Sequence, residues 1–109
     1  MIKGGSRSAN IGERTEKIAL KALRQLELEG KISFFARTNE SGYDYTIQKK
    51  DGHWTLIEVK SSTRGAKRHK KRYPTPCLVI RNHRSNIPSD LEAQLVAKAK
   101  RDIIKLLQE

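Results

Sequence analysis

The sequence predicts a single α/β (α+β) domain in which helices flank a mixed β-sheet, in the order α-β-β-β-(basic loop)-β-α. Three observations indicate this class. Segments with apolar residues at helical spacing lie near both ends of the chain, and several short apolar runs lie between them. The length of 109 residues leaves room for one domain. Strands enclosed by amphipathic helices are typical of a sheet that is covered by helices.

The first helix is expected over residues 11–29, behind a flexible basic arm of residues 1–9. Asn10 and Glu13 have the spacing of a capping pair at a helix start, and Gly30 stands where helices commonly end. Between these signals the apolar residues recur every three or four positions: Ile18, Ala19, Ala22, Leu23 and Leu26.

Three strands are expected next. Residues 32–36 are apolar and aromatic, and a polar loop is expected over residues 37–42. Residues 43–48 and 54–60 flank a turn at Lys50, Asp51 and Gly52, which is a β-hairpin pattern.

The last part of the chain predicts one more strand and one more helix. Residues 78–81 form a short apolar run that is typical of a buried strand. Ser89 and Glu92 then have the spacing of a second capping pair, with Pro88 as the boundary. An apolar stripe continues to about residue 108 through Leu91, Leu95, Ala99, Ile103, Leu106 and Leu107.

The charge balance indicates a polyanionic partner. The chain has 23 Lys and Arg against 12 Asp and Glu, which gives a net charge of +11 and a pI of about 10.1. Such a surplus favours nucleic acid, because each neutralised phosphate releases condensed counterions. Cys77 is the only cysteine, which excludes an intramolecular disulfide and a thiolate zinc cluster. No apolar run is long enough to span a membrane and no signal peptide is evident, so a cytoplasmic location is expected.

One strand carries the residues that point to chemistry. Glu58 and Lys60 are two residues apart in the expected strand 54–60, so they lie on the same face of the sheet. Trp54 and Leu56 share that face, and they are expected to be core or sheet residues that surround Glu58 with apolar surface. A charged pair at the end of such a strand is costly to bury without partners.

Asp44 at the start of the preceding strand completes a candidate metal site. Asp44 and Glu58 offer carboxylate oxygens, and the carbonyl of Val59 adds a further possible ligand. These donors suit Mg²⁺, with Mn²⁺ as a substitute, and such a metal stabilises the developing charge on a phosphate. Lys60 would orient or deprotonate the attacking water, or neutralise the transition state. The alternative is an ordinary strand ion pair without catalysis.

A strongly basic segment follows this strand. Residues 61–76 contain almost nothing apolar and two prolines, so a long basic loop, or a segment that becomes ordered on binding, is expected. Its cations would contact the phosphates of the nucleic-acid backbone without recognising base sequence. Lys3 and Arg7 of the arm would extend this basic surface. The segment contains Arg64, Lys67, Arg68, His69, Lys70, Lys71 and Arg72.

The order of these motifs resembles the PD-(D/E)xK nuclease superfamily, which includes type II restriction enzymes and archaeal Holliday-junction resolvases. The matching residues are Gly42-Tyr43-Asp44 and Ile57-Glu58-Val59-Lys60-Ser61, after the helix that contains Gly12 to Glu16. The resemblance covers roughly residues 5–62. It implies a restriction-endonuclease-like fold, with a mixed central sheet flanked by helices.

The resemblance also implies that an acidic residue of the first helix contributes to the metal site. Glu16 is followed by Ala19 and Leu23 at the spacing of the family's helix, and we favour it. Glu13 with Arg14 instead resembles the Glu-Arg pair of the resolvases, and Arg14 is then a candidate DNA contact. The chain departs from the family in one respect, because members usually place a helix where residues 61–76 follow the Glu-x-Lys strand.

The sequence is therefore interpreted as a Mg²⁺-dependent endonuclease that acts on branched or duplex DNA and works as a homodimer. A chain this short has few loops to read base edges, so selection of DNA structure is expected, as in a junction resolvase. The alternatives are a non-catalytic basic DNA- or RNA-binding protein, or a nuclease subunit of a restriction or repair complex.

Overall fold

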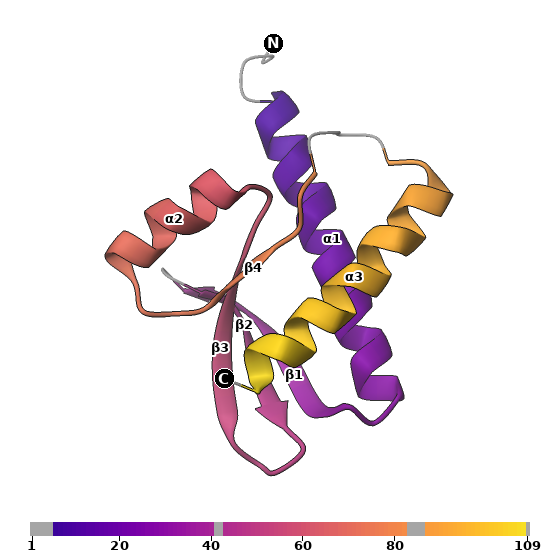
Figure 1. The fold of residues 1–109 in the computed structure, drawn as a ribbon, viewed down its shortest axis with the longest axis vertical. Helices are drawn as coiled ribbons and strands as arrows, with labels where there is room; N and C mark the ends of the chain where they lie inside the picture. The colour runs from indigo at the N-terminus through magenta and orange to yellow at the C-terminus, as the bar shows by residue number, and fades with distance from the viewer. Residues whose placement is uncertain (1–5, 41–42, 83–86, 109) are drawn as a thin grey trace.

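The computed structural model describes residues 6–40, 43–82 and 87–108. These residues form an α+β fold with a four-stranded mixed sheet and three helices (Figure 1). The elements in chain order are α1 (Ser6–Leu28), β1 (Ile32–Glu40), β2 (Tyr43–Lys49), β3 (Trp54–Lys60), α2 (Thr63–Arg72), β4 (Cys77–Val79) and α3 (Ser89–Leu107).

The sheet has the strand order β1-β2-β3-β4 and contains both kinds of pairing. β1, β2 and β3 are antiparallel neighbours, whereas β4 runs parallel to β3. The hairpin predicted around Asp51 is confirmed, and Gly52 adopts φ +92° in its turn, a conformation that favours glycine. A parallel β4 requires a crossover after β3, and this crossover contains α2.

Helices α1 and α3 pack against each other on one face of the sheet (Figure 1). The apolar stripe predicted for α1 is buried, and in the stripe predicted for α3 Ala99 and Ile103 are buried while the four leucines are half-buried. The buried residues of both helices meet the inward-facing strand residues Tyr45, Ile47, Ile57 and Val59. Neither these helices nor the other described helix is both long and apolar enough to span a membrane. α2 lies away from this layer, beside β3 and β4.

The first helix begins earlier than the sequence predicts. It starts at Ser6, so the described part of the expected basic arm is helical and Asn10 lies inside the helix, not at its cap. The spacing of Asn10 and Glu13 was therefore misleading, because these residue types cost only tenths of a kcal/mol inside a helix. The predicted end is confirmed, with Gly30 at φ +74°.

Two strand boundaries also differ from the prediction. β1 continues to Glu40, although residues 37–42 were expected to form a polar loop. Arg37 pairs with Tyr45 and Glu40 with Tyr43, so backbone pairing with β2 outweighs the polar side chains. β4 covers Cys77–Val79, one or two residues before the predicted strand 78–81.

The expected basic loop contains a helix. α2 occupies Thr63–Arg72, and the side chain of Ser62 caps it by accepting a hydrogen bond of 3.0 Å from the backbone N–H of Gly65. Only Ala66 and His69 are buried, Gly65 is half-buried, and the remaining residues are exposed. The loop prediction was wrong because a helix this short needs only two inward positions, and one of them is a histidine that was counted as a cation.

The last helix is predicted well except at its start. Pro88 occupies the N-cap position of α3 and forms no side-chain capping bond, so the capping pair of Ser89 and Glu92 is not formed. Asp90 and Glu92 instead place negative charge in the first turn, where the helix dipole stabilises it.

Candidate active site

The start of β2 is tied to the end of β3 by a side-chain hydrogen bond. Asp44 Oδ2 accepts a bond of 2.8 Å from the backbone N–H of Val59. Tyr45 pairs with Ile57 in the antiparallel ladder, so Asp44 and Glu58 follow at the end of that ladder. This contact brings together two of the residues that the sequence singled out, although they are far apart in the chain.

Glu58 and Lys60 form the ion pair that their spacing predicts. Lys60 Nζ lies 3.0 Å from Glu58 Oε2, and Glu58 is only 9% exposed while Lys60 is half-buried. The expected apolar cover from Trp54 and Leu56 is wrong, because both of these side chains are exposed. The sheet face is covered by a helix at the Glu58 end only, where α2 packs.

The carboxyl group of Glu58 has a perturbed acidity. Burial raises its pKa above the ordinary value of 4.5. The neighbouring carboxylate of Asp44 raises the pKa further, whereas the ammonium group of Lys60 lowers it. A buried carboxyl group with a raised pKa next to a second carboxylate is typical of a functional site, and a bound cation would stabilise its charged form.

The raised pKa predicts that Glu58→Gln stabilises the protein at neutral pH in EDTA. The folded state resists ionisation of Glu58, so the free energy of unfolding falls as the pH rises from about 4.5 through the higher folded pKa. The variant lacks this cost. Its Tm should exceed that of the wild type at pH 7, and by less as the pH approaches 4. Thermal unfolding followed by circular dichroism tests this. A lower Tm for the variant at pH 7 would contradict the prediction.

Glu16 is the acidic residue of the first helix that reaches the site. It lines a cavity of about 270 Å³ together with Asp44, Glu58, Val59 and Lys60. Its Oε1 also accepts a bond of 2.7 Å from Arg37 on β1. Glu13, the other candidate, does not line this cavity; its exposed side chain lies 3.6 Å from Lys17.

The donor set suits a hard divalent cation, but the carboxylates are held by protein cations. Asp44, Glu58 and Glu16 offer oxygen ligands around one cavity, which fits Mg²⁺. Within the described residues, however, no three acidic, His or Cys side chains are close enough to form a complete metal-binding group. Lys60 forms an ion pair with Glu58, and Arg37 forms one with Glu16. A bound metal would therefore have to replace these two cations as the partner of each carboxylate.

His69, which the sequence places among the cations of the basic segment, is a site residue. Its side chain is buried in α2, with Nδ1 3.8 Å from Glu58 Oε2. Nε2 lies 3.2 Å from the carbonyl oxygen of Thr75, which can only accept, so Nε2 carries a proton. The ring also packs on Tyr73 with the centroids 5.1 Å apart. His69 therefore joins α2 to Glu58, and its i, i+3 spacing from Ala66 was the only signal for this role.

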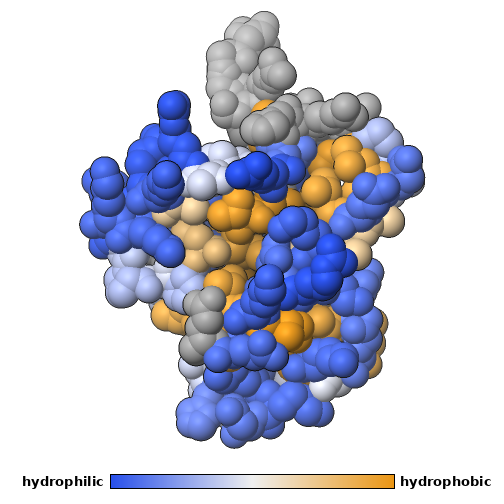
Figure 2. Space-filling model, in the orientation of Figure 1, coloured by the Kyte–Doolittle hydropathy of each residue, from blue (hydrophilic) through white to orange (hydrophobic). Residues whose placement is uncertain are grey.

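The exposed face of α2 provides a basic surface next to the acidic residues. A cleft of about 690 Å³ is lined by Arg68, Lys71 and Arg72 of the helix together with Glu58 and Lys60. Figure 2 shows this strongly hydrophilic surface at the upper left. The other predicted DNA contacts do not line this cleft. Arg64, Lys67 and Lys70 are exposed on α2, and Arg14 is exposed on α1. The side chain of Arg7 is not described, and Lys3 lies outside the described residues.

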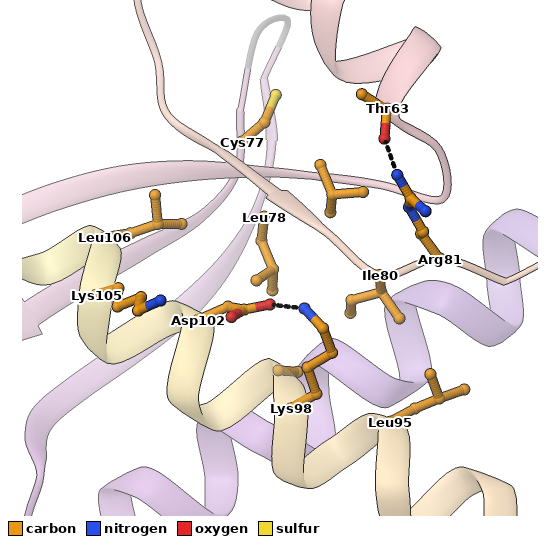
Figure 3. Close-up of a pocket in the computed structure, with 12 residues that line it drawn as sticks. Thr63, Cys77, Leu78, Ile80, Arg81, Leu95, Lys98, Asp102, Lys105 and Leu106 are labelled. Atoms are coloured by element: carbon orange, nitrogen blue, oxygen red, sulfur yellow. Dashed lines mark hydrogen bonds and ion pairs between the residues drawn. The ribbon is translucent and has the colours of Figure 1, made fainter.

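A separate cavity lies between β4 and α3 (Figure 3). Its volume is about 540 Å³, and its lining is largely apolar, with Leu78, Ile80 and Leu95 among the residues that face it. Lys98 and Asp102, which form an ion pair 2.6 Å long, also line it. None of the residues that line it is a predicted site residue, so the chemistry expected from the sequence is confined to the end of β3.

Comparisons of the chain with known protein families, characterised proteins and solved structures gave no match. The interpretation of the site therefore depends on the contacts described above and on the order of the motifs along the chain.

Proposed function

We propose that this protein is a metal-dependent endonuclease that hydrolyses DNA phosphodiester bonds, with a restriction-endonuclease-like site of the PD-(D/E)xK type. The observation that carries the proposal is the hydrogen bond between Asp44 and the backbone of Val59. This bond holds Asp44 at the end of β3, where Asp44, Glu58 and Lys60 line one cavity together with Glu16 of α1. This is the combination of two strand carboxylates, a lysine and a helix acid that the motif order predicts.

Each residue has a distinct task in this proposal. Asp44 and Glu58 hold the cation, and Glu16 is an accessory ligand. Mg²⁺ or Mn²⁺ would supply charge stabilisation at the scissile phosphate. Lys60 is partly exposed and directed toward the same cavity, so its ammonium group can approach the phosphate once it leaves Glu58. There it would orient or deprotonate the attacking water, or neutralise the transition state.

The basic surface of α2 supports recognition of the DNA backbone. Arg68, Lys71 and Arg72 share a cleft with Glu58 and Lys60, so phosphates bound by the helix lie next to the proposed catalytic residues. Cations of this kind position DNA without reading its sequence. Selection of a branched structure, as in a junction resolvase, is therefore the favoured specificity, and a homodimer would deliver the two cuts that a junction requires.

A non-catalytic DNA- or RNA-binding protein is the second candidate. The 3.0 Å pair between Glu58 and Lys60 favours it, because this contact would then be a structural ion pair. The lack of a complete metal-binding group among the described side chains favours it as well. A nuclease subunit of a larger complex would show a competent site with weak activity alone.

A cleavage assay separates these functions. The full chain is incubated with labelled four-way junction, flap, duplex and single-stranded DNA, in Mg²⁺, Mn²⁺ or EDTA. We expect cutting that depends on the divalent cation and is stopped by EDTA, with a preference for branched DNA. Tight, salt-sensitive binding without cutting on any substrate would overturn the catalytic proposal for the isolated chain and support the binding protein.

A further inference from the structure

Exposed apolar side chains gather on one face of the sheet. Among the described residues, four large apolar side chains are exposed, and three of them share this face: Phe34 (45% exposed), Trp54 (55%) and Leu56 (36%). Phe34 pairs with Gln48, and Gln48 pairs with Trp54, so the two aromatic residues lie on one line across the strands. This face is opposite the one that α1 and α3 cover.

The two aromatic rings form an ordered pair. The ring centroids of Phe34 and Trp54 lie 6.0 Å apart with an interplanar angle of 73°, an edge-to-face contact. The contact restricts both side chains before any ligand arrives, which lowers the entropy cost of binding. Exposed apolar surface of this kind is typical of an interaction site.

This surface lies on the same strand as the proposed active site and ends where α2 covers Glu58. Trp54, Leu56, Glu58 and Lys60 alternate along β3 on the same face, at a spacing of about 7 Å. A ligand strand about 20 Å long would therefore reach from Trp54 to Lys60. The exposed surface thus ends beside the cleft that contains Glu58, Lys60 and the cations of α2.

Cations near both ends of the surface favour a polyanionic occupant. Lys31 is exposed before β1 and Lys50 is exposed in the hairpin turn before Trp54, while Lys60 and the cations of α2 lie at the other end. The Nζ atom of Lys50 lies beside Gly30 at the end of α1, and Asp51 is also exposed in this turn. Aromatic side chains between cations are the combination by which proteins bind single-stranded nucleic acid, because bases stack on the rings while phosphates contact the cations. A second copy of this +11 chain would instead bring like charges together.

We propose that the surface formed by Phe34, Trp54 and Leu56 binds an unpaired DNA strand and leads it toward Glu58 and Lys60. This inference rests on the proposed function, because it names the class of substrate: DNA with a single-stranded segment next to the bond that is cut. Bases stack on Trp54 and Phe34, and the phosphate that follows lies at the acidic cavity.

Trp54 is the only tryptophan in the chain, so its fluorescence reports directly on the surface. The full chain is titrated in EDTA, which prevents metal-dependent cleavage, with a 12-nucleotide oligo(dT) and with a duplex of equal length. Fluorescence anisotropy of labelled DNA measures binding in parallel. We expect oligo(dT) to quench Trp54 strongly and the duplex to quench it weakly. Saturated binding of oligo(dT) without quenching would overturn the proposal.

Variants at Phe34 test the same surface while leaving the reporter in place. Phe34→Ala should weaken oligo(dT) binding by about tenfold and leave duplex binding unchanged. Phe34→Tyr keeps an aromatic ring and should retain the affinity. Leu28→Ala is the control, since Leu28 is 87% exposed at the end of α1. Equal affinity of Phe34→Ala and the wild type for oligo(dT) would overturn the proposal, and so would a DNA-free dimer that Phe34→Ala dissociates.

These experiments distinguish a failure of the single-strand surface from a failure of the proposed nuclease function. Cation-dependent cleavage of duplex DNA without quenching of Trp54 would remove this inference and leave the nuclease in place. Quenching by oligo(dT) in a chain that cuts no substrate would support the single-strand surface and remove the catalytic assignment.

Discussion

Asp44→Asn is expected to lower the cleavage rate by about 10³-fold or more while DNA binding stays equal or becomes tighter. Asparagine keeps an oxygen that can accept the hydrogen bond from the N–H of Val59, so the link between β2 and β3 is retained. The variant loses the negative charge that holds a divalent cation. It also removes repulsion between the carboxylate and the DNA phosphates.

Single-turnover kinetics with saturating Mg²⁺ measure the cleavage rate, and fluorescence anisotropy in EDTA measures the affinity for DNA. Lys60→Ala should show the same loss of cleavage, because it removes the proposed transition-state cation. Asp51→Asn is the matched control. Asp51 is exposed in the hairpin turn before β3 and contacts His53, whereas the proposed site lies at the other end of β3. Full activity in Asp44→Asn would refute the metal site, and equal loss in Asp51→Asn would indicate a general effect on the fold.

The double variant Arg68→Ala/Lys71→Ala is expected to weaken DNA binding by roughly 30-fold at 0.15 M salt. Both side chains are exposed on α2 and line the cleft that contains Glu58 and Lys60. Each phosphate contact that is lost removes the release of about one counterion from the binding equilibrium. The slope of log K against log salt should therefore decrease in magnitude by about two. Binding measured from 0.05 to 0.3 M salt tests both values.

A control of identical charge comes from the other side of the molecule. Arg101→Ala/Lys105→Ala also removes one exposed arginine and one exposed lysine, here from α3, so both variants lower the net charge of +11 by two. If binding depends on α2, the α3 variant should keep nearly the wild-type affinity and slope. Equal weakening in both variants would show that net charge, not the position of α2, governs binding.

Much of the architecture could be predicted from local patterns. The buried stripe from Ile18 to Leu26 and the Asp51-Gly52 turn each depend on neighbouring residues, and β2, β3 and the end of α1 lie close to their predicted positions. The pairing of Glu58 with Lys60 follows from strand alternation alone. Predictions of helix starts were weaker, as Asn10 and Ser89 show, because capping residues are also tolerated inside helices.

The sequence by itself determined the mixed α/β arrangement, the basic surface and the order of Asp44, Glu58 and Lys60, because these depend on composition and on short-range periodicity. Only the tertiary structure decided that Glu16 lines the cavity while Glu13 does not. It also showed that residues after β3 form α2 around a buried His69.

The exposure of Trp54 was also decided only by the tertiary structure, since an apolar residue in a strand is ordinarily expected to be buried. The physical reason is the same in each case. Periodicity along a chain shows which residues share a face, but whether another element covers that face depends on contacts between residues distant in sequence. Here α2 covers Glu58 and stops short of Trp54.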